Sequence, residues 1–114
     1  MNPTIDYDPS HRILSVFIHG ELDHHSSITI REKVDIAINK HRPKLLVLDF
    51  SHVTFMDSSG IGLVMGRSRV MQENGASLLV ANPNDEIKKL MLLAGLDRLI
   101  KIVHTAHSAV DNRR

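Results

Sequence analysis

A run of polar and small residues in the middle of the chain carries the first features that suggest chemistry: Asp57-Ser58-Ser59, followed by Gly60 and Gly62. The run separates an apolar segment from a segment with helical spacing, so both serines are expected at a helix N-terminus. Unpaired backbone N–H groups and the helix dipole favour an anion there, including a phosphate attached to Ser58 or Ser59. An aspartate and a serine before a helix are also typical of an ordinary N-cap. The run is therefore interpreted either as a helix cap or as a phosphorylation site.

The two glycines need a separate explanation, because a glycine inside a helix costs up to about 1 kcal/mol relative to alanine. Tight packing of the helix against a strand is one explanation, and contact with a partner or a nucleotide is an equally good one. The sequence around Gly60 and Gly62 departs from the dinucleotide-binding fingerprint, since Met65 stands where the third glycine belongs. No dinucleotide cofactor is expected.

A second polar cluster, Asp23-His24-His25, follows an early extended run. These residue types superficially suggest a metal site or a hydrolase. Adjacent histidines do not share one face of a helix, and the remaining histidines lack ligand spacing, so no metal site is expected. The surroundings of Ser58 also differ from the Gly-x-Ser-x-Gly elbow of hydrolases. His24 and His25 are interpreted as polar loop residues that cap the following helix.

Apolar spacing predicts the elements that position both clusters. Extended runs at 4–7 and 12–19 are joined by Asp8-Pro9-Ser10, which predicts a hairpin. The next segment has the spacing of a helix with one buried stripe, and Ser26 or Ser27 is expected to cap its start. The stripe consists of Ile30, Val34, Ala37 and Ile38.

The rest of the chain alternates strands and helices. Residues 45–50 are almost entirely apolar, as expected of a central strand covered on both faces by helices. A helix is predicted from 58 to 74, and a second buried strand at 78–81. A third helix is predicted after Asn82-Pro83-Asn84, followed by a last strand at 99–103 and a short helical stub.

Two helices carry more detailed expectations. In the helix from 58 to 74, Ile61, Val64 and Met65 are expected to face the sheet. Leu63 and Val70 are expected to point elsewhere and to offer an apolar surface to a partner. The inner face of the third helix is predicted to consist of Ile87, Leu90, Met91 and Ala94.

The order of these elements predicts an α/β fold with right-handed crossovers, in which a mostly parallel sheet gains an antiparallel pair from the hairpin. A length of 114 residues fits one domain. The net charge of +1 provides no basic stripe for nucleic acid and no polybasic arm for lipid. No apolar run approaches the roughly 20 residues of a membrane span, and the start lacks a signal peptide, so a cytoplasmic protein is expected. The absence of cysteine excludes disulfides and thiolate zinc sites.

Three motifs together resemble the STAS-domain anti-sigma factor antagonists, of the sporulation type in particular. They are Gly-Glu-Leu-Asp-His-His at 20–25, Phe-Met-Asp-Ser-Ser-Gly-Ile-Gly at 55–62 and Ala-Gly-Leu at 94–96. The similarity spans nearly the whole chain, and the first two motifs at this separation are highly specific. The resemblance implies a single STAS domain over residues 1–114.

The resemblance also implies a phosphorylation-controlled partner switch. In this family the unphosphorylated antagonist binds an anti-sigma factor, which is also a serine kinase that binds ATP or ADP, and the sigma factor is released. The kinase phosphorylates the serine after the motif aspartate, which is Ser58 here, and a PP2C-type phosphatase reverses the reaction. No cofactor, metal or direct nucleic-acid contact is implied for the antagonist itself.

The expected partner-binding residues are Asp23, Asp57, Ser58, Ser59, Gly60, Gly62 and Leu63. A phosphate on Ser58 adds about −1.5 to −2 charges beside Asp57, so binding is expected to be lost by repulsion and steric exclusion. Two competing hypotheses remain. One is an antagonist in another partner-switching pathway, such as a general stress response, and the other is an enzyme that uses Ser58, Asp57 and His24.

Overall fold

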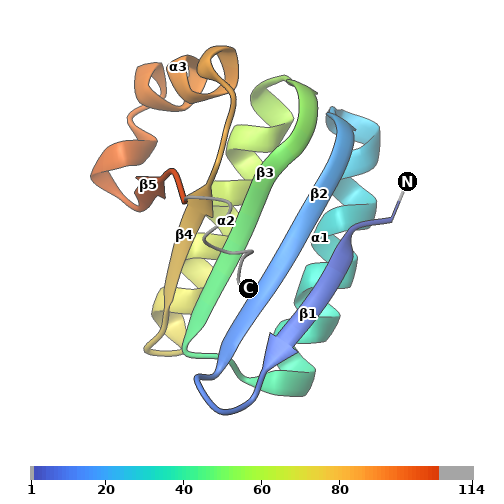
Figure 1. The fold of residues 1–114 in the computed structure, drawn as a ribbon, viewed down its shortest axis with the longest axis vertical. Coiled ribbons are helices and arrows are strands. Elements are labelled where there is room, and N and C mark those ends of the chain that lie inside the picture. Colours follow the sequence, from blue (N-terminus) through green and yellow to red (C-terminus); the bar gives the residue numbers. More distant parts are fainter. Residues whose placement is uncertain (1, 106–114) are drawn as a thin grey trace.

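The computed structural model describes residues 2–105, which form one five-stranded sheet with helices packed against it (Figure 1). The strands lie in chain order, β1-β2-β3-β4-β5. The first two pair antiparallel, as the predicted hairpin, and all other neighbours pair parallel. The strands are β1 (Thr4–Asp8), β2 (Ile13–Leu22), β3 (Leu45–Met56), β4 (Ser77–Ala81) and β5 (Lys101–Val103). The α/β class and the mixed, mostly parallel sheet are thereby confirmed.

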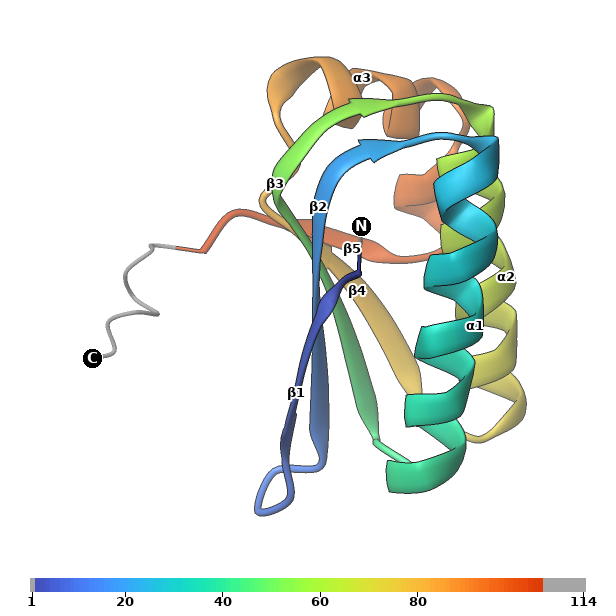
Figure 2. The same ribbon diagram turned by 90° about the vertical axis from the view of Figure 1, so that its right-hand side faces the viewer.

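The helices are α1 (His24–His41), α2 (Ser58–Glu73) and α3 (Asp85–Leu93), and a short 3₁₀ turn follows at Leu96–Arg98. Figure 2 shows α1 and α2 against one face of the sheet, with α3 at its end. The prediction that helices cover both faces of β3 is therefore wrong. Along this strand, fully buried Leu46, Leu48 and Phe50 alternate with partly buried residues, which is the pattern of a strand with one covered face.

The core lies between the sheet and the two long helices. The predicted buried stripe of α1 is confirmed, and alternate residues in the first part of β2 are also buried. In α2, Ile61 and Val64 are buried as predicted, but Leu63 is 5% exposed and Met65 is 39% exposed, the reverse of the expectation. The reason is that α2 packs against α1 as well as against the sheet. The contact with α1 extends the buried face of α2 to include Leu63.

The C-terminal elements follow the prediction in part. Ile87 and Met91 on α3 are buried and Leu90 packs partly against the core, whereas Ala94 is exposed because the helix ends at Leu93. Gly95 ends this segment with φ of 78°, a left-handed conformation that glycine adopts without strain. The last strand is shorter than predicted, and the expected helical stub lies outside the described residues.

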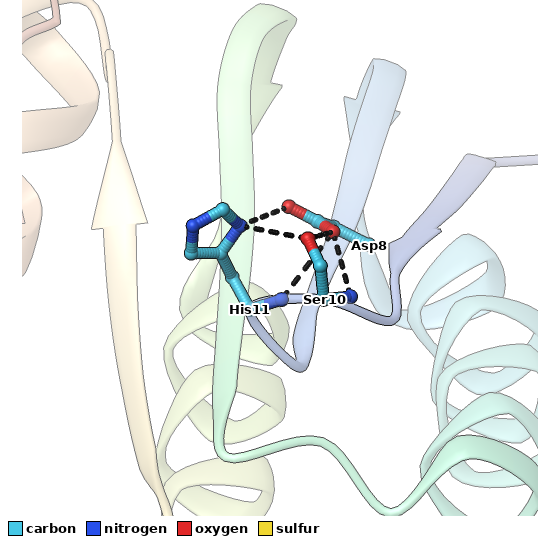
Figure 3. Close-up of polar contacts among 3 residues, drawn as sticks. All are labelled: Asp8, Ser10 and His11. Carbon is cyan, nitrogen blue, oxygen red and sulfur yellow. Dashed lines mark hydrogen bonds and ion pairs between the residues drawn. The ribbon is translucent and has the colours of Figure 1, made fainter.

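The hairpin turn is held by a carboxylate, as Figure 3 shows. Asp8 Oδ1 accepts hydrogen bonds from Ser10 Oγ at 2.8 Å and from the Ser10 N–H at 3.0 Å, and Asp8 Oδ2 lies 2.8 Å from His11 Nδ1. The bond from the Ser10 hydroxyl, followed by that from His11, lowers the pKa of Asp8 to about 2. The ionised carboxylate is thus favoured by the folded hairpin.

This shift predicts an acid sensitivity of the turn. Because the folded-state pKa lies below the unfolded value of 3.8, the contribution of Asp8 to stability is present above pH of about 4 and is lost as pH falls toward 2. We expect Asp8→Asn to be less stable than the parent at pH 7 and to show a smaller fall in melting temperature between pH 4 and pH 2.5. Thermal unfolding across this range measures both values, and Asp6→Asn is the control on the same strand. An unchanged pH profile in Asp8→Asn would contradict the assignment.

Candidate functional site

The two polar clusters meet at the carboxyl ends of β2 and β3. Leu22 and Met56, the last residues of these strands, are register partners. Asp23 directly follows Leu22, and Asp57 directly follows Met56. The Asp57 N–H also donates to the Leu22 carbonyl at 3.3 Å. Figure 1 shows α1 and α2 beginning at this same end of the sheet. The structure therefore brings together two motifs that are far apart in the sequence.

Asp57 is the N-cap of α2. Its Oδ1 accepts a hydrogen bond from the Ser59 N–H at 2.8 Å, and its carbonyl accepts one from the Gly60 N–H at 3.0 Å. Ser58 is exposed in the first turn, whereas Ser59 is half-buried. Both interpretations of the Asp-Ser-Ser run are thus compatible: the aspartate caps the helix, and the hydroxyl of Ser58 remains accessible for modification.

Asp23 plays the same part at α1. Its Oδ1 accepts from the Ser26 N–H at 2.9 Å, and Ser26 Oγ accepts from the Asp23 N–H at 3.0 Å, which together form a capping box. The expectation that Ser26 or Ser27 is the N-cap is wrong, because both lie inside the helix. His24 and His25 occupy the first turn as exposed helical residues and do not cap it.

The capping bonds also favour the ionised form of Asp23. The hydrogen bond from the Ser26 N–H is the main cause that lowers the pKa of Asp23 below its ordinary value. The folded chain thus holds Asp23 ionised to lower pH than an ordinary aspartate, and the stability that this contributes is lost as pH falls below 3.8. A phosphate on Ser58 would join a surface that is already acidic.

The structure explains Gly60 and Gly62, near the start of α2, in different ways. A Cβ on Gly60 would overlap the side chain of Met56 and come within 3.1 Å of Leu22 Cδ2, so tight packing explains this glycine. A Cβ on Gly62 would meet nothing within 4 Å, and Gly62 is exposed. Packing against the core therefore does not account for Gly62.

The seven predicted contact residues thus divide into two groups. Asp23, Asp57, Ser58, Ser59 and Gly62 lie wholly or partly at the surface, on the neighbouring starts of α1 and α2. Gly60 and Leu63 are buried, and we exclude both from the contact surface because they offer almost no area to a partner.

A shallow cleft of about 260 Å³ between α1 and α2 extends this surface. Ser59, Gly62 and Gly66 line it from α2, and Ile28, which is 40% exposed, lines it from α1. Its far end is held by the ion pair of Arg67 Nε with Asp35 Oδ1 at 3.2 Å. Sequence reasoning missed the cleft, although the i,i+4 spacing of Gly62 and Gly66 was an available signal.

A metal centre and a membrane-spanning helix have no counterpart in the described part of the chain. Among residues 2–105, no three histidine, aspartate or glutamate side chains are grouped so that they could hold a metal ion. Within the same range, no helix is long and apolar enough to span a bilayer.

Comparison with known proteins identifies the family. The STAS domain family matches residues 4–109. The anti-sigma F factor antagonist of Paenibacillus polymyxa is 33% identical over 90% of this chain and 87% of its own length. The anti-sigma-B factor antagonist of Bacillus subtilis is 30% identical over 90% of this chain and 92% of its own.

Solved structures agree with the sequence comparison. The anti-sigma factor antagonist SpoIIAA in its unphosphorylated form superimposes with a TM-score of 0.78 at 29% identity, covering 98% of this chain and 96% of that one. Its phosphorylated form from Bacillus gives a TM-score of 0.71 at the same identity, covering 98% and 99%. The chain belongs to the STAS domain family and, within it, to the anti-sigma factor antagonists.

Proposed function

We propose that the unphosphorylated chain binds an anti-sigma factor and so releases a sigma factor, and that phosphorylation of Ser58 ends this binding. The observation that carries the proposal is the exposed Ser58 at the start of α2, beside the capping carboxylates Asp57 and Asp23. The relatives named as anti-sigma F factor antagonists support the partner class. SpoIIAA, described in unphosphorylated and phosphorylated forms, supports control by phosphorylation.

The proposed switch acts through charge at a helix N-terminus. The first turn of α2 presents backbone N–H groups and the positive end of the helix dipole, so a phosphate on Ser58 leaves the fold intact. The same phosphate adds about −1.5 to −2 charges next to Asp57. A partner surface that accommodates a neutral hydroxyl rejects this group, because the added charge would be desolvated without a counter-ion.

The proposed partners follow from this reaction. The anti-sigma factor is itself the serine kinase and holds ATP or ADP, and a PP2C-type phosphatase removes the phosphate. The antagonist contributes the acceptor hydroxyl and the contact surface, and it performs no catalysis. Its proposed location is the cytoplasm, where its partners act on transcription.

A second candidate function uses the same surface in a different pathway. The 30% identity to the anti-sigma-B factor antagonist of Bacillus subtilis favours a role in a general stress response. The two candidates differ in the anti-sigma factor that is bound. Titration of this chain against the anti-sigma F and anti-sigma B proteins of one host separates them, since the cognate partner should bind at least tenfold more tightly.

The modification site can be tested directly with the cognate kinase and ATP. We expect one phosphate per chain, on Ser58, because Ser58 is exposed whereas Ser59 is half-buried with its N–H bonded to Asp57. Peptide mapping by mass spectrometry locates the phosphate. Ser58→Ala should accept none and should bind the kinase persistently, while Ser59→Ala should be phosphorylated like the parent. Phosphate on Ser59, or on the Ser58→Ala chain, would overturn the assignment.

A further inference from the structure

A basic cleft lies at the end of the molecule opposite Ser58. It has a volume of about 330 Å³ and is formed where the hairpin, the α1–β3 connection and the α2–β4 connection meet. Figure 1 shows these three connections together at the lower end of the sheet, with the starts of α1 and α2 at the upper end. The 16 residues of α2 separate the two ends by about 24 Å.

Three cationic side chains line this cleft: Arg12 from the hairpin, and Arg42 and Lys44 from the connection after α1. All three residues are exposed. Among the described residues that line the cleft there is no carboxylate to balance them. Arg12 Nη2 donates to the Arg42 carbonyl at 2.7 Å, which holds this guanidinium at the cleft while using one of its five N–H donors.

The backbone at two of these residues is unusual. Within residues 2–105, positive φ outside glycine occurs at Arg12 (57°), Arg42 (49°) and Asn82 (61°). Asparagine is among the residues that tolerate this conformation, whereas for arginine it is strained and glycine is favoured. Arg42 is moreover the C-cap of α1, next to the position at which glycine most often ends a helix. Two arginines thus stand in one cleft at backbone positions that favour glycine.

The helix dipole explains only part of this arrangement. A cation near the C-terminus of α1 is stabilised by the dipole, which accounts for Arg42. Arg12 lies in the hairpin and not in a helix, so the dipole does not explain its position. Its backbone is nevertheless strained, and its side chain reaches the Arg42 carbonyl at the cleft. A ligand that needs all three cations explains their convergence.

We propose that this cleft binds a small polyanion that carries two or more phosphate groups. Arginine presents a planar fork of donors that matches phosphate oxygens in a bidentate manner, and lysine adds a point charge. The cleft volume is about ten times the volume that one molecule occupies in liquid water, so the cleft accommodates more than a single phosphate. The site is separate from the proposed partner switch and does not depend on it.

The experiment is an NMR titration of the full, unphosphorylated chain with pyrophosphate, at constant ionic strength maintained with chloride. We expect saturable shifts of the amide signals of Arg12, Arg42, Lys44 and Gly75, and none at Ser58. Inorganic phosphate should bind at least tenfold more weakly. Shifts that stay linear with concentration, or that centre on Ser58, would overturn the proposal.

A matched pair of variants separates a built site from general attraction. Arg42→Gly removes one cation at a position whose backbone suits glycine, so its melting temperature should equal or exceed that of the parent while pyrophosphate binds at least tenfold more weakly. Arg69→Ala removes an equal charge from an exposed position of α2 outside the cleft and should change the affinity less than twofold. Equal losses in the two variants would show that only net charge attracts the anion.

Discussion

Replacing Ser58 with aspartate should weaken binding of the anti-sigma factor about a hundredfold or more and leave the fold intact. The residue is exposed at the first position of α2, where an acidic side chain interacts favourably with the helix dipole. Against a partner that accommodates a hydroxyl, the carboxylate is buried without a counter-ion. Such burial costs about 3 kcal/mol or more, and each 1.4 kcal/mol is a tenfold change in affinity.

Titration of the two proteins at a constant nucleotide concentration measures this loss, and thermal unfolding verifies the fold. Gln72→Glu is the matched control, because it adds one negative charge at the exposed far end of α2 and should change the affinity less than twofold. Higher salt should restore only part of the affinity, since screening reduces repulsion but not desolvation. Parent-like affinity of a folded Ser58→Asp chain would place Ser58 outside the interface and refute the proposed switch.

Valine at Gly60 and valine at Gly62 should have opposite consequences. Gly60→Val should lower the free energy of unfolding by about 1 to 3 kcal/mol or more, because the new side chain overlaps Met56 and presses on Leu22. Gly62→Val meets open space, so stability should change by less than about 1 kcal/mol. The added bulk should nevertheless weaken partner binding at least tenfold, because it prevents close approach to the first turn of α2.

Thermal or denaturant unfolding and partner titration, performed on both variants, test this contrast. The affinity of Gly60→Val is compared at equal concentrations of folded protein. Gly66→Val, which also meets open space one turn further along α2, shows how far the contact surface extends along the helix. A Gly62→Val chain with parent affinity would mean that the partner does not approach this turn.

The apolar spacing of the sequence predicts the elements better than it predicts their surroundings. The stripe of α1 from Ile30 to Ile38 is confirmed because it depends only on the period of a helix. The run at 45–50 is equally apolar, but such a run does not reveal whether one or both faces of a strand are covered, since half-exposed positions also tolerate apolar side chains. The faces expected for Leu63 and Met65 are wrong for a related reason, because their environment depends on α1, a different element.

Local pattern predicts the candidate site residue by residue, whereas only the family resemblance places Asp23 on the same surface as Ser58. Asp57 and Ser58 could be placed at a helix start from local pattern alone, and the structure confirms that placement. The proximity of Asp23 depends on the register between Leu22 and Met56, and local pattern carries no information on register between distant strands. Likewise, the different reasons for Gly60 and Gly62 depend on which side chains lie across the core.

The pairing of Leu22 with Met56 makes the proximity of Asp23 and Asp57 a property of the folded chain only. Asp23 and Asp57 are separated in sequence by the whole of α1 and β3, and they become neighbours once the parallel pairing of β2 and β3 is complete. A kinase that reads both carboxylates would therefore ignore nascent or misfolded copies. Under the proposed switch, such recognition would act as quality control, because the amount of sigma factor released would report the number of correctly folded antagonists and not the number synthesised.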